Sequence, residues 1–153
     1  MFSDSLHLVH MSWDPVHFQN GQLLHAAFSS DDLLNVNNRF VSVDREDLIC
    51  KSAVDHRVKA QREKGDKRDF PKFSYLRCGE FQGVIDPKDN TKLFVVFSDK
   101  VKGHPSLPDN PAHCGIRGRD PQKKSKGYKQ LLRTKLVNSI QKTIDYSEVD
   151  WKN

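Results

Sequence analysis

The residues best suited to chemistry lie between His104 and Gly118, in the sequence HPSLPDNPAHCGIRG. Histidine is the side chain whose ordinary pKa lies nearest neutrality, so His113 can give or take a proton, and Arg117 can hold a phosphate or an oxyanion. Together with the more distant His10, these residues predict the acid–base centre of a metal-independent nuclease. The alternative interpretation is structural: three prolines stiffen a loop, and His113 makes hydrogen bonds inside the fold.

The same stretch contains possible metal ligands and one possible nucleophile. Zinc accepts ligands of the types found at His104, Asp109, His113 and Cys114. However, the chain has no Cys-x-x-Cys or His-Glu-x-x-His pair, and adjacent residues of a strand point to opposite faces. Cys114 beside a histidine has the makings of a nucleophile, but a cysteine between apolar neighbours is more often part of a core. We therefore expect no metal and no covalent chemistry there.

The formal net charge of +5 is unevenly distributed along the chain. The acidic part is residues 1–50, with two arginines against seven acids, whereas residues 115–142 carry nine basic residues against the single Asp120. Clustered basic side chains neutralise phosphates and release counterions, which gives salt-dependent affinity for nucleic acid. The sequence therefore predicts binding of nucleic acid or another polyanion through Lys123, Lys124, Lys126, Lys129 and Arg133.

Hydropathy patterns predict an α+β fold with a mostly antiparallel sheet and packed helices. Strands are expected at 5–11, 39–43, 72–78, 80–85 and 92–98, with a short closing strand in the sequence AHCGI. The most apolar run, 93–97, is expected to be the central strand. These strands would position the histidines and Arg117 described above.

Three helices are expected beside the sheet. Asp14 before Pro15 predicts a turn and a short helix closed by Gly21, and Asp44 is expected to cap a helix that ends near residue 65. The clearest helix covers 126–144 and is basic and amphipathic. Its apolar residues recur every fourth position, at Tyr128, Leu132, Leu136, Ile140 and Ile144.

Length and composition bound the class of protein. A chain of 153 residues is expected to form a single domain, 1–153, with an ordinary core. Its three cysteines are an odd number without paired spacing, which argues against a disulfide framework. The first residues do not resemble a signal peptide, and no apolar segment approaches the roughly 20 residues that span a bilayer. We therefore expect a cytoplasmic protein without a membrane partner, and the possibility of a homo-oligomer stays open.

Two fragments resemble a known family. AFSS…NNRFVSVDRED (26–47) and LPDNPAHCGI (107–116) are similar to segments shared by an uncharacterised family of small bacterial proteins, which have an AF…SVDR segment followed by an NPAH segment. This resemblance implies a bacterial source and no particular activity.

The order of elements also resembles that of ADP-ribosyltransferase-like toxins. These run from a first strand with Arg or His, through a helix ending in Gly, to a strand carrying a serine, and a later glutamate completes their NAD site. The matching positions here are His10, Gly21, Ser42 and Glu80. The resemblance implies NAD as the cofactor; otherwise we expect no cofactor.

Three functions from different classes follow. The leading hypothesis is a bacterial protein directed at nucleic acid, most simply RNA, as a toxin or defence component. The second is an NAD-using ADP-ribosyltransferase-like enzyme. The third is a non-catalytic interaction module. A cleft between His10 and Ser42 would favour the second, and a shallow basic cleft at His113 would favour the first.

Overall fold

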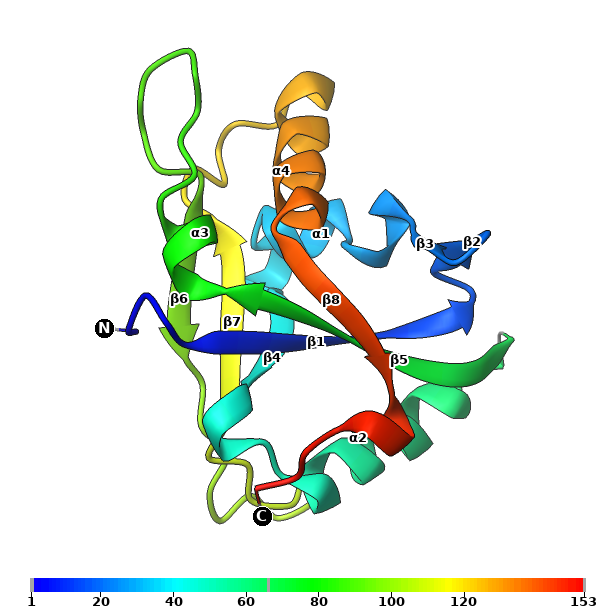
Figure 1. Cartoon of the computed structure of the whole chain (residues 1–153). Helices are drawn as coiled ribbons and strands as arrows, with labels where there is room; N and C mark the ends of the chain where they lie inside the picture. The colour runs from blue at the N-terminus through cyan, green and yellow to red at the C-terminus, as the bar shows by residue number, and fades with distance from the viewer. Residues whose placement is uncertain (1, 66, 153) are drawn as a thin grey trace.

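The computed structural model of the chain describes residues 2–65 and 67–152. Its main sheet has the strand order β6-β7-β4-β1-β5-β8, and neighbouring strands pair antiparallel (Figure 1). These strands are β1 (His7–Pro15), β4 (Val41–Arg45), β5 (Arg68–Arg77), β6 (Phe94–Ser98), β7 (His113–Gly118) and β8 (Ile140–Asp145). A small hairpin is formed by β2 (Phe18–Gln19) and β3 (Gln22–Leu23). The α+β class with a mostly antiparallel sheet is therefore confirmed.

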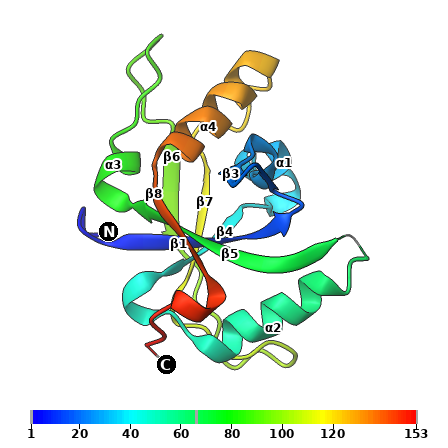
Figure 2. The same ribbon diagram turned by 45° about the vertical axis from the view of Figure 1, so that its right-hand side comes forward.

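Two longer helices cover the sheet, α4 from one side and α2 from the other (Figures 1 and 2). The helices are α1 (Ser30–Leu33), α2 (Lys51–Arg62), α3 (Cys78–Gln82) and α4 (Lys126–Asn138). On α4 the apolar stripe Tyr128, Leu132 and Leu136 is buried, as its spacing indicates. Within the described residues, no helix has the length and apolar character needed to cross a membrane.

The two sides of the sheet bury separate apolar clusters. Successive residues of a strand face opposite sides, so on β1 Leu8 joins the cluster under α4 and Val9 joins the cluster under α2. The α4 cluster contains the fully buried Leu132, and the α2 cluster contains the fully buried Trp13. The sheet is thus held by packing on both faces.

The two central strands separate part of the way along their length. β1 pairs with β4 only through Leu8↔Arg45 and Val9↔Asp44, whereas it pairs with β5 from His7 to Pro15. β4 meanwhile follows β7. In Figure 1, β1 and β5 run roughly horizontally, whereas β7 runs roughly vertically. Beyond Val9 the sheet therefore opens into a gap between β1 and β4, which we call the split.

Two helix predictions near the N-terminal half were wrong in position. Residues 12–18 do not form a helix: β1 extends to Pro15, and the chain turns through the β2–β3 hairpin, where Asn20 and Gly21 both have positive φ. An Asn-Gly pair is the usual signal for such a turn. The helix expected from Asp44 begins only at Lys51, because pairing within the sheet keeps Asp44 in β4.

Three further expectations were corrected by tertiary pairing. The segment expected as strand 80–85 contains α3 instead. The helix expected over 126–144 ends at Asn138, and Ile140 and Ile144 belong to β8, since a spacing of four places residues on one face of a strand as well as a helix. All of the apolar run 93–97 except Leu93 lies in β6, an edge strand, and the centre of the sheet is formed by β4 and β1.

Candidate functional site

A cavity of about 260 Å³ occupies the split between β1 and β4, and we call it the split pocket. The pocket exists because the backbones of these strands no longer pair beyond Val9 and Asp44. Side chains from β1, β4, α2, the segment before and within α1, and the start of β5 line it. They are His10, Met11, His17, Ala26, Ala27, Ser29, Asp32, Phe40, Val41, Ser42, Arg57, Gln61, Lys64 and Arg68.

His10 of β1 is the most unusual group in the split pocket. It is only 8% exposed, its ring lies 4.6 Å from the Phe28 ring, and its buried Nδ1 has no hydrogen-bond partner among the described residues. Burial, and then the nearby His17 and Arg57, lower the pKa of His10 from 6.5 to about 3. At neutral pH the ring is therefore uncharged, with one ring nitrogen that a ligand or a water must satisfy.

The charged lining of the split pocket is mainly basic. Arg57, Lys64 and Arg68 line it against the single acid Asp32, which accepts a hydrogen bond of 2.8 Å from Arg39 Nε. Burial raises the pKa of Asp32, although the positive charge of Arg39 acts to lower it. A cavity with this lining attracts an anion rather than a cation.

A buried network holds Arg57 at the wall of the split pocket. Asp44 of β4 is 2% exposed and accepts hydrogen bonds from Arg57 Nη1 at 2.8 Å and from Asn110 Nδ2 at 2.9 Å. Burial alone would raise the pKa of Asp44, but Arg57 and the Asn110 amide lower it below its usual value. The carboxylate is thus ionised and ties β4, α2 and the loop before β7 together. Sequence reasoning missed this network.

The three residues expected to form an acid–base centre do not line one cavity. His10 lines the split pocket, whereas His113 lines a groove between α2 and the loop before β7, beside Leu107 and Arg57. His113 Nδ1 lies 3.0 Å from the Asp99 carbonyl oxygen and 3.1 Å from its carboxylate. Arg117 lines neither cavity and donates a 2.9 Å hydrogen bond to the Gly118 carbonyl. The roles of these residues stay predictions.

The remaining chemical groups of the 104–118 stretch serve the fold. Cys114 is buried, and its desolvation raises the pKa of the thiol to about 11, so it is protonated at neutral pH. His104 Nδ1 accepts from the backbone N–H of Ser106, and Asp109 accepts from that of Gly103. Across residues 2–65 and 67–152, no three His, Cys, Asp or Glu side chains are grouped to hold a metal ion.

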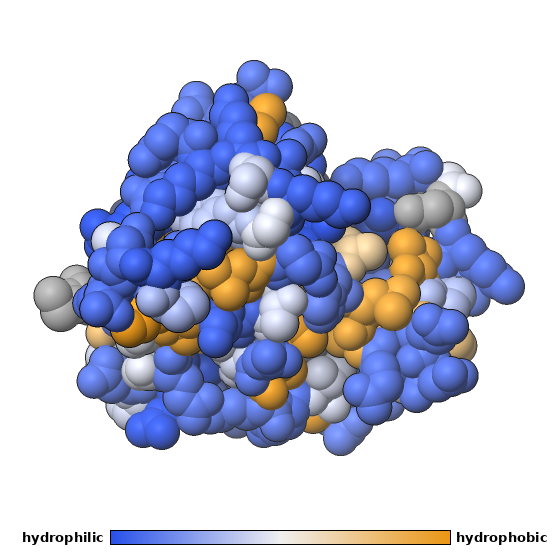
Figure 3. Space-filling model, turned by 90° about the horizontal axis from the view of Figure 1, so that it is seen from above, coloured by the Kyte–Doolittle hydropathy of each residue, from blue (hydrophilic) through white to orange (hydrophobic). Residues whose placement is uncertain are grey.

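The basic residues expected to bind nucleic acid differ in their surroundings. Lys123 lies 2.9 Å from Asp89 and 3.4 Å from Asp120, and Arg133 donates to the Phe28 carbonyl at 2.8 Å. Lys124 and Lys126 are exposed. Figure 3 shows the molecule from above as a mainly hydrophilic surface, with apolar side chains in narrow bands between polar ones.

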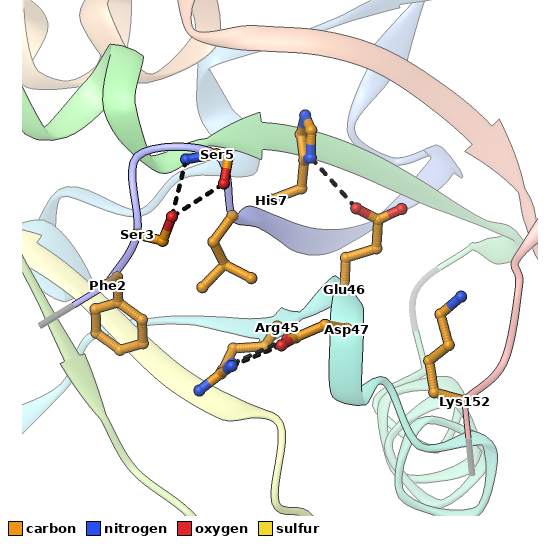
Figure 4. Close-up of a pocket in the computed structure, with 9 residues that line it drawn as sticks. Phe2, Ser3, Ser5, His7, Arg45, Glu46, Asp47 and Lys152 are labelled. Atoms are coloured by element: carbon orange, nitrogen blue, oxygen red, sulfur yellow. Dashed lines mark hydrogen bonds and ion pairs between the residues drawn. The ribbon is translucent and has the colours of Figure 1, made fainter.

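A second hollow lies beside the N-terminal segment (Figure 4), and its charges are paired internally. His7 and Glu46 point toward each other, with His7 Nδ1 3.3 Å from the carboxylate. Arg45 contacts Asp47 at 2.6 Å. Because the opposite charges satisfy one another, this hollow offers a ligand less than the split pocket does.

The positions matched by the toxin resemblance are only partly brought together. His10 and Ser42 line the same pocket from opposite sides of the split. Gly21 lies in the β2–β3 turn, and Glu80 lies in α3, where it accepts a hydrogen bond from Gln141 Nε2 at 3.0 Å. Glu80 does not line the split pocket.

Sequence reasoning missed the residues that α2 contributes. Arg57 and Gln61 of α2 line the split pocket, and Lys64 lines it from just beyond the end of the helix at Arg62. Their spacing of four and then three residues places them on one face of a helix. This run of polar residues was the feature of the sequence that could have indicated a site, because it interrupts the face that α2 packs toward the sheet.

Comparison of the chain with protein-family models, with curated proteins and with solved structures finds no match.

Proposed function

We propose that this protein binds a phosphate-bearing nucleotide group in the split pocket. The observation that carries the proposal is the buried, unpartnered Nδ1 of His10, which lies at a cavity lined by three basic residues and one acid. A buried polar atom without a partner is costly, so a ligand that supplies a hydrogen bond there gains affinity. The basic lining favours an anionic ligand.

Cavity size limits how much of the ligand is enclosed. Small-molecule sites commonly span roughly 300–1,000 Å³. The split pocket, at about 260 Å³, lies just below that range. It therefore suits a group of mononucleotide size rather than a complete dinucleotide, such as one half of NAD or a single nucleotide of an RNA chain.

The lining residues divide into two roles. Lys64 and Arg68 are suited to the phosphate, since ammonium and guanidinium groups donate to phosphate oxygens, whereas both Nη atoms of Arg57 already donate to Asp44. Neutral His10 and the Ser42 hydroxyl are suited to the hydroxyl groups of a ribose, because each can donate or accept a hydrogen bond. Asp44 acts as a positioning residue, because it holds Arg57 in place.

NAD and RNA remain the two sources of such a group. The placement of His10 and Ser42 on opposite sides of one pocket supports NAD. Because Glu80 lies elsewhere, the proposal concerns binding and not ADP-ribosyl transfer. The RNA hypothesis keeps its own support, the exposed Lys124 just before α4 and the exposed Lys126 at its start.

Calorimetric titration with AMP, NAD and a short uridine-rich RNA tests the proposal and separates the sources. The double substitution Lys64→Gln with Arg68→Gln should weaken AMP binding at least about tenfold, which corresponds to 1.4 kcal/mol. The matched double substitution Lys124→Gln with Lys126→Gln makes the same change of net charge outside the pocket and should leave AMP affinity unaltered. Equal effects of the two doubles, or no AMP binding by the unaltered protein, would contradict the proposal.

A further inference from the structure

The edge strand β6 has an open backbone and an apolar surface. Outside its pairing with β7, residues 94–98 make no backbone hydrogen bond to any other described residue. Val95, Val96 and Phe97 are partly exposed along it. A strand edge of this kind is a template for pairing with another extended segment, and proteins usually blunt it with a charge or a proline within the strand. β6 has neither.

A groove of about 520 Å³ runs beside this edge and is basic. Lys92, Lys100 and Arg119 line it together with Arg45, and no acidic residue does. Arg45 is paired with Asp47, but none of the other three forms an ion pair with any residue in 2–65 or 67–152, and all three are exposed. The nearby Asp99 contacts His113 instead. The edge therefore combines open backbone groups with three unpaired positive charges.

A second copy of the chain is a poor partner for this edge. Antiparallel pairing of two β6 strands centred on Val96 would place Lys92 beside the partner's Lys100, since each lies four residues from Val96. Like charges placed opposite each other destabilise a strand pair. The positive ends of β6 thus disfavour self-association.

Single-stranded nucleic acid fits this edge less well than a peptide does. Proteins that bind it combine a basic groove with aromatic side chains on which bases stack. Along β6 the aromatic residues are not available in this way: Phe94 is 3% exposed, and Phe97 packs edge-on against Phe40 with ring centroids 5.0 Å apart. What the edge offers is backbone hydrogen bonding, and an extended peptide uses it fully.

We propose that β6 is a docking edge for an extended, acidic peptide segment of a partner protein. The segment adds a strand beside β6, its backbone pairs with residues 94–98, and its acidic side chains lie against Lys92, Lys100 and Arg119. Alternate apolar side chains of the segment cover Val95 and Phe97. This docking edge is separate from the split pocket, so either proposal can fail without the other.

A seven-residue peptide of alternating glutamate and valine, blocked at both ends, is the probe. Titration into isotope-labelled protein, followed by amide chemical shifts and amide hydrogen exchange, should slow exchange within 94–98. A peptide with proline in place of each valine has the same charge but lacks the N–H donor at every valine position and cannot form a regular strand, so it should bind at least about tenfold more weakly. Replacing Lys92, Lys100 and Arg119 together with glutamine should weaken the valine peptide by a similar factor.

Matched controls separate strand addition at β6 from general attraction between a basic protein and an acidic peptide. Replacing Lys124, Lys126 and Lys129 together with glutamine removes the same charge from the α4 region and should change peptide affinity less than about twofold. Equal weakening by both triple variants, equal binding of the proline peptide, or protection outside 94–98 would overturn the proposal. Tighter binding of oligouridine at the same amides, or self-association through them, would also overturn it.

Discussion

The central strands of the sheet and its edge strand β6 reverse the usual distribution of polar and apolar residues. β1 and β4 bury His10, Ser12 and Asp44, which are 8%, 0% and 2% exposed. β6, at the edge, carries the uninterrupted sequence FVVFS with three partly exposed apolar residues. Buried polar groups are costly without partners, and open apolar edges invite pairing, so both departures need a compensating reason. On our two proposals, a nucleotide group in the split pocket would supply that reason in the centre, and an acidic peptide segment would supply it at the edge.

The two regions also differ in what stabilises them. In the centre, Asp44 is satisfied by Arg57 and Asn110, so its charge is compensated inside the fold. At the edge, Lys92 and Lys100 have no such partner among the described residues. Substitutions in the centre should therefore change the free energy of unfolding, whereas substitutions at the edge should mainly change binding.

The largest expected effect is that of Asp44→Asn. The substitution leaves Arg57, whose side chain is 19% exposed, without its counter-charge, and breaking a buried pair in this way costs about 3–5 kcal/mol. Urea denaturation measures the change. The control is Asp150→Asn, which removes a carboxylate that is 82% exposed and should leave the unfolding midpoint unchanged. Similar midpoints for the two variants would show that the buried pair of Asp44 with Arg57 does not stabilise the centre of the fold.

A matched pair of valine substitutions compares the two regions directly. Val43→Thr places a hydroxyl at a fully buried position of β4, and a buried hydroxyl without a partner costs about 1–3 kcal/mol. Val96→Thr makes the same change on β6, where the side chain is partly exposed, and should cost less than about 0.5 kcal/mol. If Val96→Thr were the more destabilising of the two, Val96 would contribute more to the core than its partial exposure indicates.

The pH dependence of stability isolates His10. Its pKa is about 3 in the fold against 6.5 in the unfolded chain, so between these values only the unfolded chain binds the proton. Stability is full above pH 6.5 and falls as the pH is lowered toward 3, by about 2 kcal/mol between pH 6.5 and 5. His10→Gln should abolish this part of the slope.

Asp32, whose pKa burial raises above 3.8, also changes stability toward the low end of this window, so the substitution isolates His10 rather than the window alone. Asp44 has a lowered pKa, so its contribution is present above its ordinary value of 3.8 and is lost only at lower pH. His104→Gln, at an exposed loop residue, is the control and should keep the slope of the unaltered protein. An unchanged slope in His10→Gln would show that water or a counter-charge already satisfies the ring.

The smallest effect is expected for substitutions of the basic residues near α4, a third region besides the central strands and β6. The charge of Lys123 is already compensated by Asp89 and Asp120, whereas Lys126 is exposed. Lys126→Gln should therefore lower the salt concentration that elutes the protein from heparin, and Lys123→Gln should lower it less. The opposite order would mean that the charge cluster around Lys123 opens on polyanion binding.

The fold class followed from the sequence because local periodicity and sheet pairing agree over most of the chain. Strands expected at 39–43 and 72–78 correspond to β4 and β5, and the closing strand corresponds to β7. Hydrophobic periodicity predicted the wrong element where a spacing of four fits both a helix and a strand, as at Ile140 and Ile144. It also failed where an apolar run was taken to be a buried strand, as in β6.

The candidate site was only partly predictable. Ser42 was singled out only by a resemblance in layout, and His10 by that resemblance and as a distant member of the expected acid–base centre. Nothing in the local sequence indicates that β1 and β4 stop pairing after Val9. Arg57 and Lys64 belong to the segment expected as a helix ending near residue 65, and Arg68 follows it, so none of the three was singled out as a site residue. Counting charges along the sequence could not distinguish these residues from Lys123. The charge of Lys123 is compensated by Asp120, three residues away, and by Asp89, from a distant segment.

The central claim is that a phosphate-bearing nucleotide group binds beside His10 in the split pocket. The most direct measurement is nitrogen-detected NMR of the histidine rings during titration with AMP, with signals assigned by substituting each histidine in turn. Binding in the split pocket should shift the ring-nitrogen resonances of His10 and His17 in step with saturation, and leave those of His104 and His113 in place. A saturable shift at His113 alone, or no histidine shift at AMP concentrations that saturate binding, would contradict the claim.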